Sequence, residues 1–187
     1  LGGGAVMRNK RPAARNIGID IDQQVIDIAK NPSLFTYLRD CPKTQIVKGD
    51  GRLAIRELAN GSQKLIILDA FNSDAVPVHL MTLEAFKLYK RKISKDGIIL
   101  VNLSNRHLKL LPVVNAVAHS LDLMTLHISH KGDRKLGQFD SDWALLTANQ
   151  DFVFRLPTSS GWNFLADYQG LLWTDDYSNI IPLIKCC

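Results

Sequence analysis

Two aspartates, Asp69 and Asp74, lie at the end of a predicted buried strand and in the loop that follows it. One carboxylate there could take a proton from an ammonium-bearing substrate while the other holds the amine in place. Aspartates in loops are also common turn formers, which is the structural alternative. The strand-end position favours the chemical role, because ligands of open α/β sheets bind beyond the carboxyl ends of the strands.

Asp20 and Asp50 end two other predicted strands and could bind a nucleoside. Asp20 lies about where an acidic residue binds a ribose diol in dinucleotide-binding sheets, and Asp50 could accept a hydrogen bond from the exocyclic amine of adenine. Both could instead cap the helices that follow, as could Asp22. Since acids at successive strand ends point into one crevice, we expect Asp20, Asp50 and Asp69 to share a site.

Glycines accompany these acids in the sequence. Gly2, Gly3 and Gly4 would let backbone amides approach a ligand closely, and a flexible terminus is the alternative. Gly51 would permit a tight turn after Asp50. We therefore regard these glycines as candidates for lining a ligand beside the acids.

The elements that must position these residues alternate between strands and helices along the chain. The expected strands are 16–21, 44–47, 64–69, 97–103, 123–128 and 143–148, and the expected helices are 22–30, one with Leu53, Ile55 and Leu58, 79–93 and 111–121. Strand 64–69 is expected to be fully buried because its apolar residues are continuous. The pattern predicts an α/β fold with a doubly wound, mostly parallel, Rossmann-like sheet and an antiparallel edge hairpin around 129–141.

Residues 1–150 are expected to form one domain, onto which 151–187 packs as an irregular cap with Trp162, Phe164, Trp173 and Tyr177. The opening Leu1-Gly2-Gly3-Gly4 is what should follow a central first strand. Without that strand, its two neighbours would present unpaired backbone groups at about 1–3 kcal/mol each. We therefore expect the first strand to be missing from this sequence, which would be a fragment or lack preceding residues.

Composition limits the class of protein. The 187 residues are 46% hydrophobic and 22% charged, with a net charge of +5, which is typical of a soluble globular protein. No apolar run approaches the ~20 residues of a membrane helix, so we expect a cytoplasmic protein without a membrane segment. The basic residues have no interleaved aromatics, which argues against nucleic acid, and the scattered histidines predict no metal site.

Further polar residues are weaker candidates for substrate binding. Asn105 follows a strand end, with a polar loop as the alternative. Asp175 and Asp176 beside Tyr177 suit a cationic group, with a turn in the cap as the alternative.

Taken together, the glycine loop, Asp20-Ile21-Asp22, Gly49-Asp50 and Asp69…Asp74-Ala75-Val76-Pro77 resemble the spermidine synthase family. The resemblance is closest to bacterial spermidine synthase-like proteins, including those fused to a membrane transporter domain. The segments that resemble this subgroup are 35–40, 69–80, 104–106 and 173–179.

This resemblance implies a class I S-adenosylmethionine-dependent methyltransferase fold without the family's N-terminal β domain. It implies transfer of an aminopropyl group from decarboxylated S-adenosylmethionine to a diamine such as putrescine, a small-molecule polyamine substrate. Gly2–Gly4 would line the cofactor, Asp20 would bind the ribose and Asp50 the adenine. Asp69 would be the base and Asp74 would orient the amine. Whether the protein forms a homodimer is left open.

Two alternatives stay open at this point. One is a methyltransferase that uses intact S-adenosylmethionine on the same fold. The other is a non-catalytic remnant or interaction module of a larger, transporter-fused protein.

Overall fold

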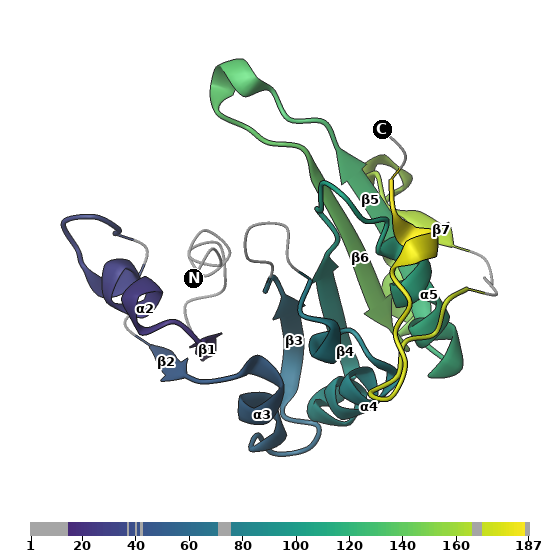
Figure 1. Cartoon of the computed structure of the whole chain (residues 1–187), viewed down its shortest axis with the longest axis horizontal. Helices are drawn as coiled ribbons and strands as arrows, with labels where there is room; N and C mark the ends of the chain where they lie inside the picture. Colours follow the sequence, from purple (N-terminus) through teal and green to yellow (C-terminus); the bar gives the residue numbers. More distant parts are fainter. Residues whose placement is uncertain are drawn as a thin grey trace. The chain divides into compact units, whose positions relative to one another are not determined.

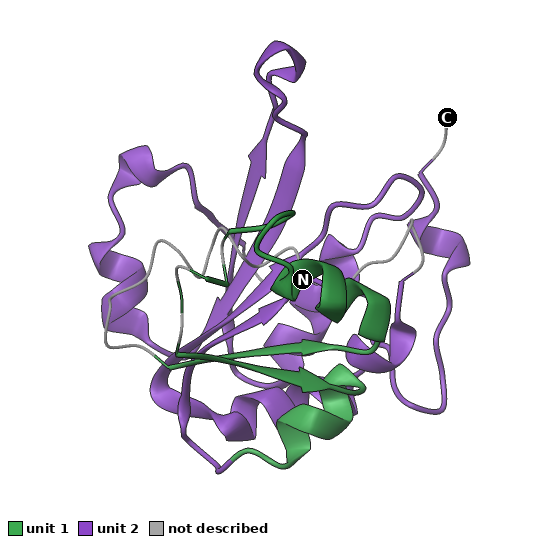
Figure 2. Ribbon diagram, turned by 90° about the vertical axis from the view of Figure 1, so that its left-hand side faces the viewer, with its two compact units in different colours: residues 1–58 green, residues 59–187 purple. Residues whose placement is uncertain are grey.

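The structure, a computed structural model, describes residues 15–36, 38–39, 41, 43–70, 76–165 and 170–185 (Figure 1). Gly2–Gly4 and Asp74 lie outside these described residues. The chain divides into two compact units, Leu1–Leu58 and Ala59–Cys187 (Figure 2). Each unit is described by itself below. The predicted division near residue 150 stays a prediction.

Unit 1 contains a pair of parallel strands, β1 (Asn16–Asp20) and β2 (Thr44–Lys48), in register from Asn16–Thr44 to Asp20–Lys48. Helix α2 (Gln23–Lys30) follows β1, and helix α3 (Gly51–Arg56) follows β2. Both predicted strands and the predicted helix 22–30 are confirmed to within one residue at each bound. The second helix forms with Leu53 and Ile55, but it ends at Arg56 and does not include the predicted Leu58. The short β-α connections place the starts of both helices at the carboxyl ends of the strands.

Unit 2 contains a five-stranded sheet in the order β3-β4-β6-β5-β7. Its strands are β3 (Gln63–Leu68), β4 (Ile93–Asn102), β5 (Met124–His130), β6 (Ser141–Thr147) and β7 (Asn163–Leu165). β3 and β4 are parallel, whereas the three other pairings are antiparallel. The predicted α/β class is confirmed, with a mixed sheet in this unit.

The described residues of unit 2 contain three α-helices: α4 (Leu83–Lys92), α5 (Leu111–Ser120) and α6 (Gln150–Arg155). α4 contacts β4, α5 contacts β5, and the two helices contact each other. Phe86 and Tyr89 of α4 are completely buried and meet edge to face at 5.4 Å. No helix in the described ranges is long and apolar enough to cross a membrane.

Helix α4 begins later than the predicted start at residue 79. A short 3₁₀ turn, η1 (Val78–Leu80), comes first. Thr82 then caps α4, because its Oγ1 accepts a hydrogen bond from the Ala85 N–H at 3.3 Å. Capping by a hydroxyl satisfies one of the donors that a helix start leaves unpaired, and so fixes where the helix begins.

Strand β3 is not fully buried, contrary to the prediction. Ile66 and Leu68 are buried, whereas Leu65 between Lys64 and Ile66 is 47% exposed. Burial therefore alternates in the strand's second half, as it does when only one face of a strand is covered by the core.

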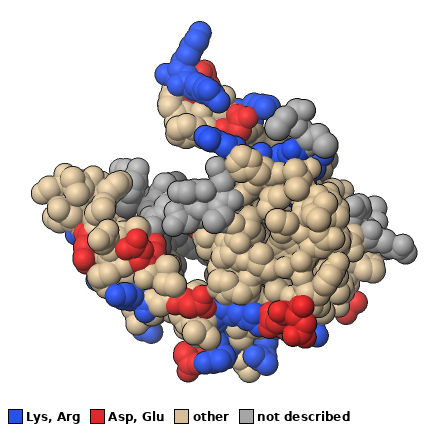
Figure 3. All heavy atoms as spheres, in the orientation of Figure 1, with Lys and Arg blue, Asp and Glu red and all other residues tan. Residues whose placement is uncertain are grey.

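The predicted antiparallel hairpin is confirmed as β5 and β6, which pair from Met124–Thr147 to His130–Ser141. It does not form the edge of the sheet, because β7 pairs with β5 on its other side. The hairpin tip, drawn in light green in Figure 1, includes the short turn η2 (Arg134–Leu136). Lys and Arg side chains gather there (Figure 3).

The C-terminal segment is part of unit 2. It is less irregular than expected, since its described residues include most of α6, β7 and two short 3₁₀ turns, η3 (Thr158–Ser160) and η4 (Ile181–Leu183). Trp173 is completely buried, and its carbonyl accepts a hydrogen bond from the Leu83 N–H at 2.8 Å. Phe164 and Tyr177 remain more than half exposed. Trp173 is thus the aromatic residue that anchors this segment to the start of α4.

Candidate functional site

Asp69 and Asn102 lie side by side at the carboxyl end of the parallel pair in unit 2. Leu68 of β3 is in register with Val101 of β4. The residues that follow these two, Asp69 and Asn102, are therefore also neighbours. The Asn102 Nδ2 donates a hydrogen bond to Asp69 Oδ1 at 2.7 Å. The Asp69 side chain is exposed. The predicted base is therefore accessible to a substrate and held from one side by an amide.

Sequence reasoning missed Asn102. It is the polar residue that follows the apolar run Ile98–Val101 and ends β4, whereas Asp69 comes one residue after the end of β3. Its link to Asp69 depends on the pairing and register of β3 and β4, which the sequence pattern alone does not give.

Asp20 and Asp50 lie at the carboxyl end of the strand pair in unit 1. Asp20 is the last residue of β1, and its backbone carbonyl accepts a hydrogen bond from the Gly49 N–H at 2.9 Å. Gly49 directly precedes Asp50, so the structure brings these two predicted nucleoside ligands together. Gly51, the third predicted residue of this group, is the first residue of α3.

Both carboxylates also organise the local backbone. Asp50 Oδ1 accepts a hydrogen bond from the Leu53 N–H at 2.9 Å and caps α3. Asp20 Oδ1 accepts one from the Asp22 N–H at 3.0 Å, and Asp22 in turn caps α2. A carboxylate has about four acceptor positions, so capping is compatible with binding a ligand.

The predicted residues thus fall into two described groups, one in each unit. Unit 1 joins Asp20, Asp50 and Gly51, and unit 2 joins Asp69 with Asn102. A single crevice shared by Asp20, Asp50 and Asp69 stays a prediction. So do the roles of Gly2–Gly4 and Asp74, which are outside the described residues.

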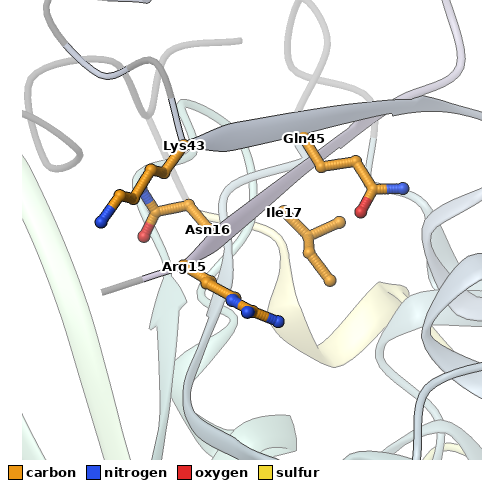
Figure 4. A pocket seen from close by; sticks show the side chains of 5 residues that line it. All are labelled: Arg15, Asn16, Ile17, Lys43 and Gln45. Carbon is orange, nitrogen blue, oxygen red and sulfur yellow. The ribbon is translucent and has the colours of Figure 1, made fainter. Parts of the chain in front are cut away.

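A cavity of about 650 Å³ lies at the opposite end of the unit 1 strands (Figure 4). It is lined by Arg15, Asn16, Ile17, Lys43 and Gln45, which stand at the starts of β1 and β2. Because Asp20 ends β1 and Asp50 comes shortly after the end of β2, this cavity is separate from the predicted nucleoside ligands.

Asn105 shapes the loop after β4. Its Oδ1 accepts hydrogen bonds from the N–H groups of His107 at 2.9 Å and Leu108 at 2.8 Å, while its backbone carbonyl accepts one from Lys185 Nζ at 2.7 Å. These contacts give Asn105 a structural role, and its predicted contact with substrate stays a prediction.

Asp175 joins the C-terminal segment to helix α4. Its Oδ1 accepts a hydrogen bond from Thr82 Oγ1 at 2.7 Å, and its N–H donates to Glu84 Oε2 at 2.9 Å. Asp176 and Tyr177 are exposed in the turn that follows, where the Thr174 N–H donates to the Tyr177 carbonyl at 2.8 Å. The turn that the sequence analysis gave as the structural alternative therefore forms. Substrate binding by Asp175, Asp176 and Tyr177 stays a prediction.

No protein-family model matches the chain. Among curated proteins, a polyamine aminopropyltransferase from Vibrio vulnificus is 33% identical over 107 residues, which are 54% of this chain and 35% of that protein. The chain therefore spans about a third of the length of this relative.

Solved structures show the same fold. A probable spermidine synthase from Corynebacterium glutamicum superposes with a TM-score of 0.63 at 16% identity, covering 90% of this chain and 66% of that one. A spermidine synthase in complex with the transition-state analogue AdoDATO gives 0.60 at 14% identity, covering 87% and 55%. Human methyltransferase-like protein 13 in complex with SAH gives 0.63 at 18% identity, covering 85% and 72%.

The predicted resemblance is confirmed by both kinds of comparison. The sequence match points to the aminopropyltransferases, and the superpositions identify the Rossmann-like fold. Over 107 residues the chain is similar in sequence to a polyamine aminopropyltransferase, and it has the α/β fold seen in the solved spermidine synthases and in methyltransferase-like protein 13.

Proposed function

We propose that this protein transfers an aminopropyl group from decarboxylated S-adenosylmethionine to a diamine such as putrescine. The observation that carries the proposal is the exposed Asp69 carboxylate at the carboxyl end of β3, held by Asn102 at 2.7 Å. The 33% identity with a polyamine aminopropyltransferase over 107 residues supports this choice of reaction.

Asp69 is proposed as the general base. The amine nitrogen attacks the methylene carbon next to the sulfonium, a C–N bond forms, and the C–S bond breaks with its electron pair going to sulfur. The attacking nitrogen loses a proton to the Asp69 carboxylate, because an ammonium has no lone pair to donate. A positioned base contributes about 10²–10⁴-fold to the rate of such a step.

Asp74 is proposed to hold the amine in line with the breaking bond. Holding reactants in a near-attack geometry supplies up to about 7–11 kcal/mol in well-oriented systems. A carboxylate suits this role, because the second ammonium or the attacking amine of a diamine donates hydrogen bonds to it.

The nucleoside is proposed to bind unit 1. Asp20 would accept from the ribose hydroxyls and Asp50 from the adenine amine, with Gly2–Gly4 and Gly51 along the cofactor. The acid pair at the ends of β1 and β2 supports this assignment, since Gly49 links the two at 2.9 Å.

The transferred group is tested directly by product analysis. The 187-residue chain is incubated with putrescine and either decarboxylated S-adenosylmethionine or S-adenosylmethionine, and the products are identified by mass spectrometry. We expect spermidine and 5′-methylthioadenosine from the decarboxylated cofactor and no methylated putrescine from the intact one. Methylated product without spermidine would overturn the proposal.

The methyltransferase alternative is favoured by one observation, the superposition on human methyltransferase-like protein 13 with a TM-score of 0.63. The same incubation distinguishes the two reactions. A non-catalytic remnant would form no product with either cofactor, and calorimetry with 5′-methylthioadenosine would then establish whether nucleoside binding survives.

A further inference from the structure

The side-chain amide of Asn102 is held at both of its ends. Its Nδ2 donates to Asp69 Oδ1 at 2.7 Å, and its Oδ1 accepts from the Ser104 N–H at 2.8 Å. The two bonds fix which way the amide faces, because a carboxylate oxygen needs a donor and a backbone N–H needs an acceptor. Reversing the amide would break both bonds.

The loop that holds Asn102 is itself tied to strand β6. The Asp142 N–H donates to Ser104 Oγ at 3.0 Å, and the Leu103 N–H donates to the Asp142 carbonyl at 2.7 Å. The Asp142 carboxylate also contacts His127 Nε2 of β5 at 2.5 Å. Hydrogen bonds thus connect the end of β3 through β4 to β6 and β5.

We propose that Asn102 is a positioning residue, which orients the Asp69 carboxylate for proton transfer; this rests on the proposed function. An exposed aspartate on its own samples several side-chain rotamers. A donor at Oδ1 selects one of them and leaves Oδ2 to receive the proton from the attacking amine. Asn102 therefore acts through Asp69 and needs no contact with substrate.

The kinetic test replaces Asn102 with leucine, which has a similar size but no donor. Because a misplacement of about 1 Å costs about 100-fold in rate, we expect Asn102→Leu to lower kcat roughly 10- to 100-fold while both KM values stay unchanged. In an Asp69→Asn background the same substitution should cause no further loss, since the base through which it acts is gone. Asn163→Leu on β7 is the matched control and should keep the wild-type rate.

A purely structural role predicts a different result. Asn102→Leu would then lower the rate by the same factor with and without the Asp69 substitution, or would raise KM in step with the fall in kcat. Either outcome would overturn the proposal.

A second measurement does not depend on turnover. In NMR spectra of the whole chain, the Asn102 side-chain NH₂ signal should lie downfield in the wild type and move upfield in Asp69→Ala, a substitution at an exposed residue. An unchanged signal would refute the link between the two residues. An inactive wild type with a shifted signal would refute the proposed reaction and keep the link, so the two failures are distinguishable.

Discussion

Asp50 has two possible functions that act through the same carboxylate. It caps α3 through the Leu53 N–H at 2.9 Å, and it is proposed to bind adenine. Capping needs only a side-chain oxygen that can accept a hydrogen bond, which serine also provides. Strong binding of an amine donor benefits from the carboxylate's charge. The two functions can therefore be separated by substitution.

We predict that Asp50→Ala and Asp50→Ser differ in stability but not in nucleoside affinity. Loss of the cap in Asp50→Ala should lower the free energy of unfolding by about 1 kcal/mol, whereas Asp50→Ser should stay close to the wild type. Both should bind 5′-methylthioadenosine at least about tenfold more weakly, because a hydrogen bond to a charged group contributes about 1.5–3 kcal/mol.

Denaturant unfolding and titration calorimetry measure these two quantities. Wild-type affinity in Asp50→Ser would show that Asp50 is a helix cap alone. The substitution Asp27→Ser, at an exposed position on α2, is a control that should leave the nucleoside affinity unchanged.

At the scale of elements, Thr82 connects two segments that are far apart in the sequence. Its Oγ1 caps α4 and donates to Asp175 Oδ1 at 2.7 Å, and its side chain is buried. We predict that Thr82→Val, which keeps the shape but removes the hydroxyl, lowers the free energy of unfolding by about 1–3 kcal/mol. Thr82→Ser, which keeps the hydroxyl, should retain most of the wild-type free energy of unfolding.

Denaturant unfolding of the three proteins checks this prediction. A Thr82→Val protein as stable as the wild type would mean that the hydroxyl's two hydrogen bonds make no net contribution. The contact between the C-terminal segment and α4 would then depend on Trp173 and on the hydrogen bond from the Asp175 N–H to Glu84 Oε2.

The tip of the β5–β6 hairpin contains a carboxylate with a shifted pKa. A hydrogen bond from Lys131 Nζ at 3.0 Å, and then one from the Gly132 N–H, hold the pKa of the Asp140 carboxyl below its ordinary value of 3.8. Because the pKa is lower in the folded state, these contacts contribute fully above pH 3.8 and are lost as the pH falls through the lowered pKa.

We predict that Lys131→Met raises the pKa of Asp140 toward 3.8. An NMR titration of the Asp140 carboxyl carbon in both proteins measures the shift. An identical titration in Lys131→Met would show that the lysine contact does not form in solution.

The elements with continuous apolar runs could be predicted from the sequence. β1, β2, β5 and β6 begin and end within two residues of their predicted bounds. β7 was missed because it is three residues long and Phe164 at its centre is 60% exposed, so no apolar pattern marks it. β4 begins at Ile93, directly after α4, because polar residues 94–96 still continue the strand.

The candidate site could be predicted only in part. The sequence alone singles out Asp20, Asp50 and Asp69 as candidates, because acids at strand ends have a recognisable chemistry. It does not single out Asn102, because an asparagine acquires a role only through its neighbour on the adjacent strand. Ligands of open α/β sheets bind beyond the carboxyl ends of the strands, which predicts the edge of the sheet where the site lies. Only the pairing of β3 with β4 identifies Asn102 as the hydrogen-bond partner of Asp69.

At the scale of the whole molecule, the proposed site residues are divided between the two compact units. The described residues of unit 1 contain the proposed nucleoside ligands, and those of unit 2 contain the proposed base. The proposed reaction requires that both act on one pair of substrates. Transfer of the aminopropyl group is therefore the property that depends on the proposed site residues of both units.

A single-turnover assay with wild type and Asp69→Asn tests this claim most directly. With enzyme in excess over decarboxylated S-adenosylmethionine and with putrescine saturating, the wild type should form equal amounts of spermidine and 5′-methylthioadenosine. Asp69→Asn should react at least about 100-fold more slowly, whereas Asp96→Asn, at an exposed position of β4, should match the wild type. Equal rates for wild type and Asp69→Asn, or a wild type that forms no spermidine, would contradict the account.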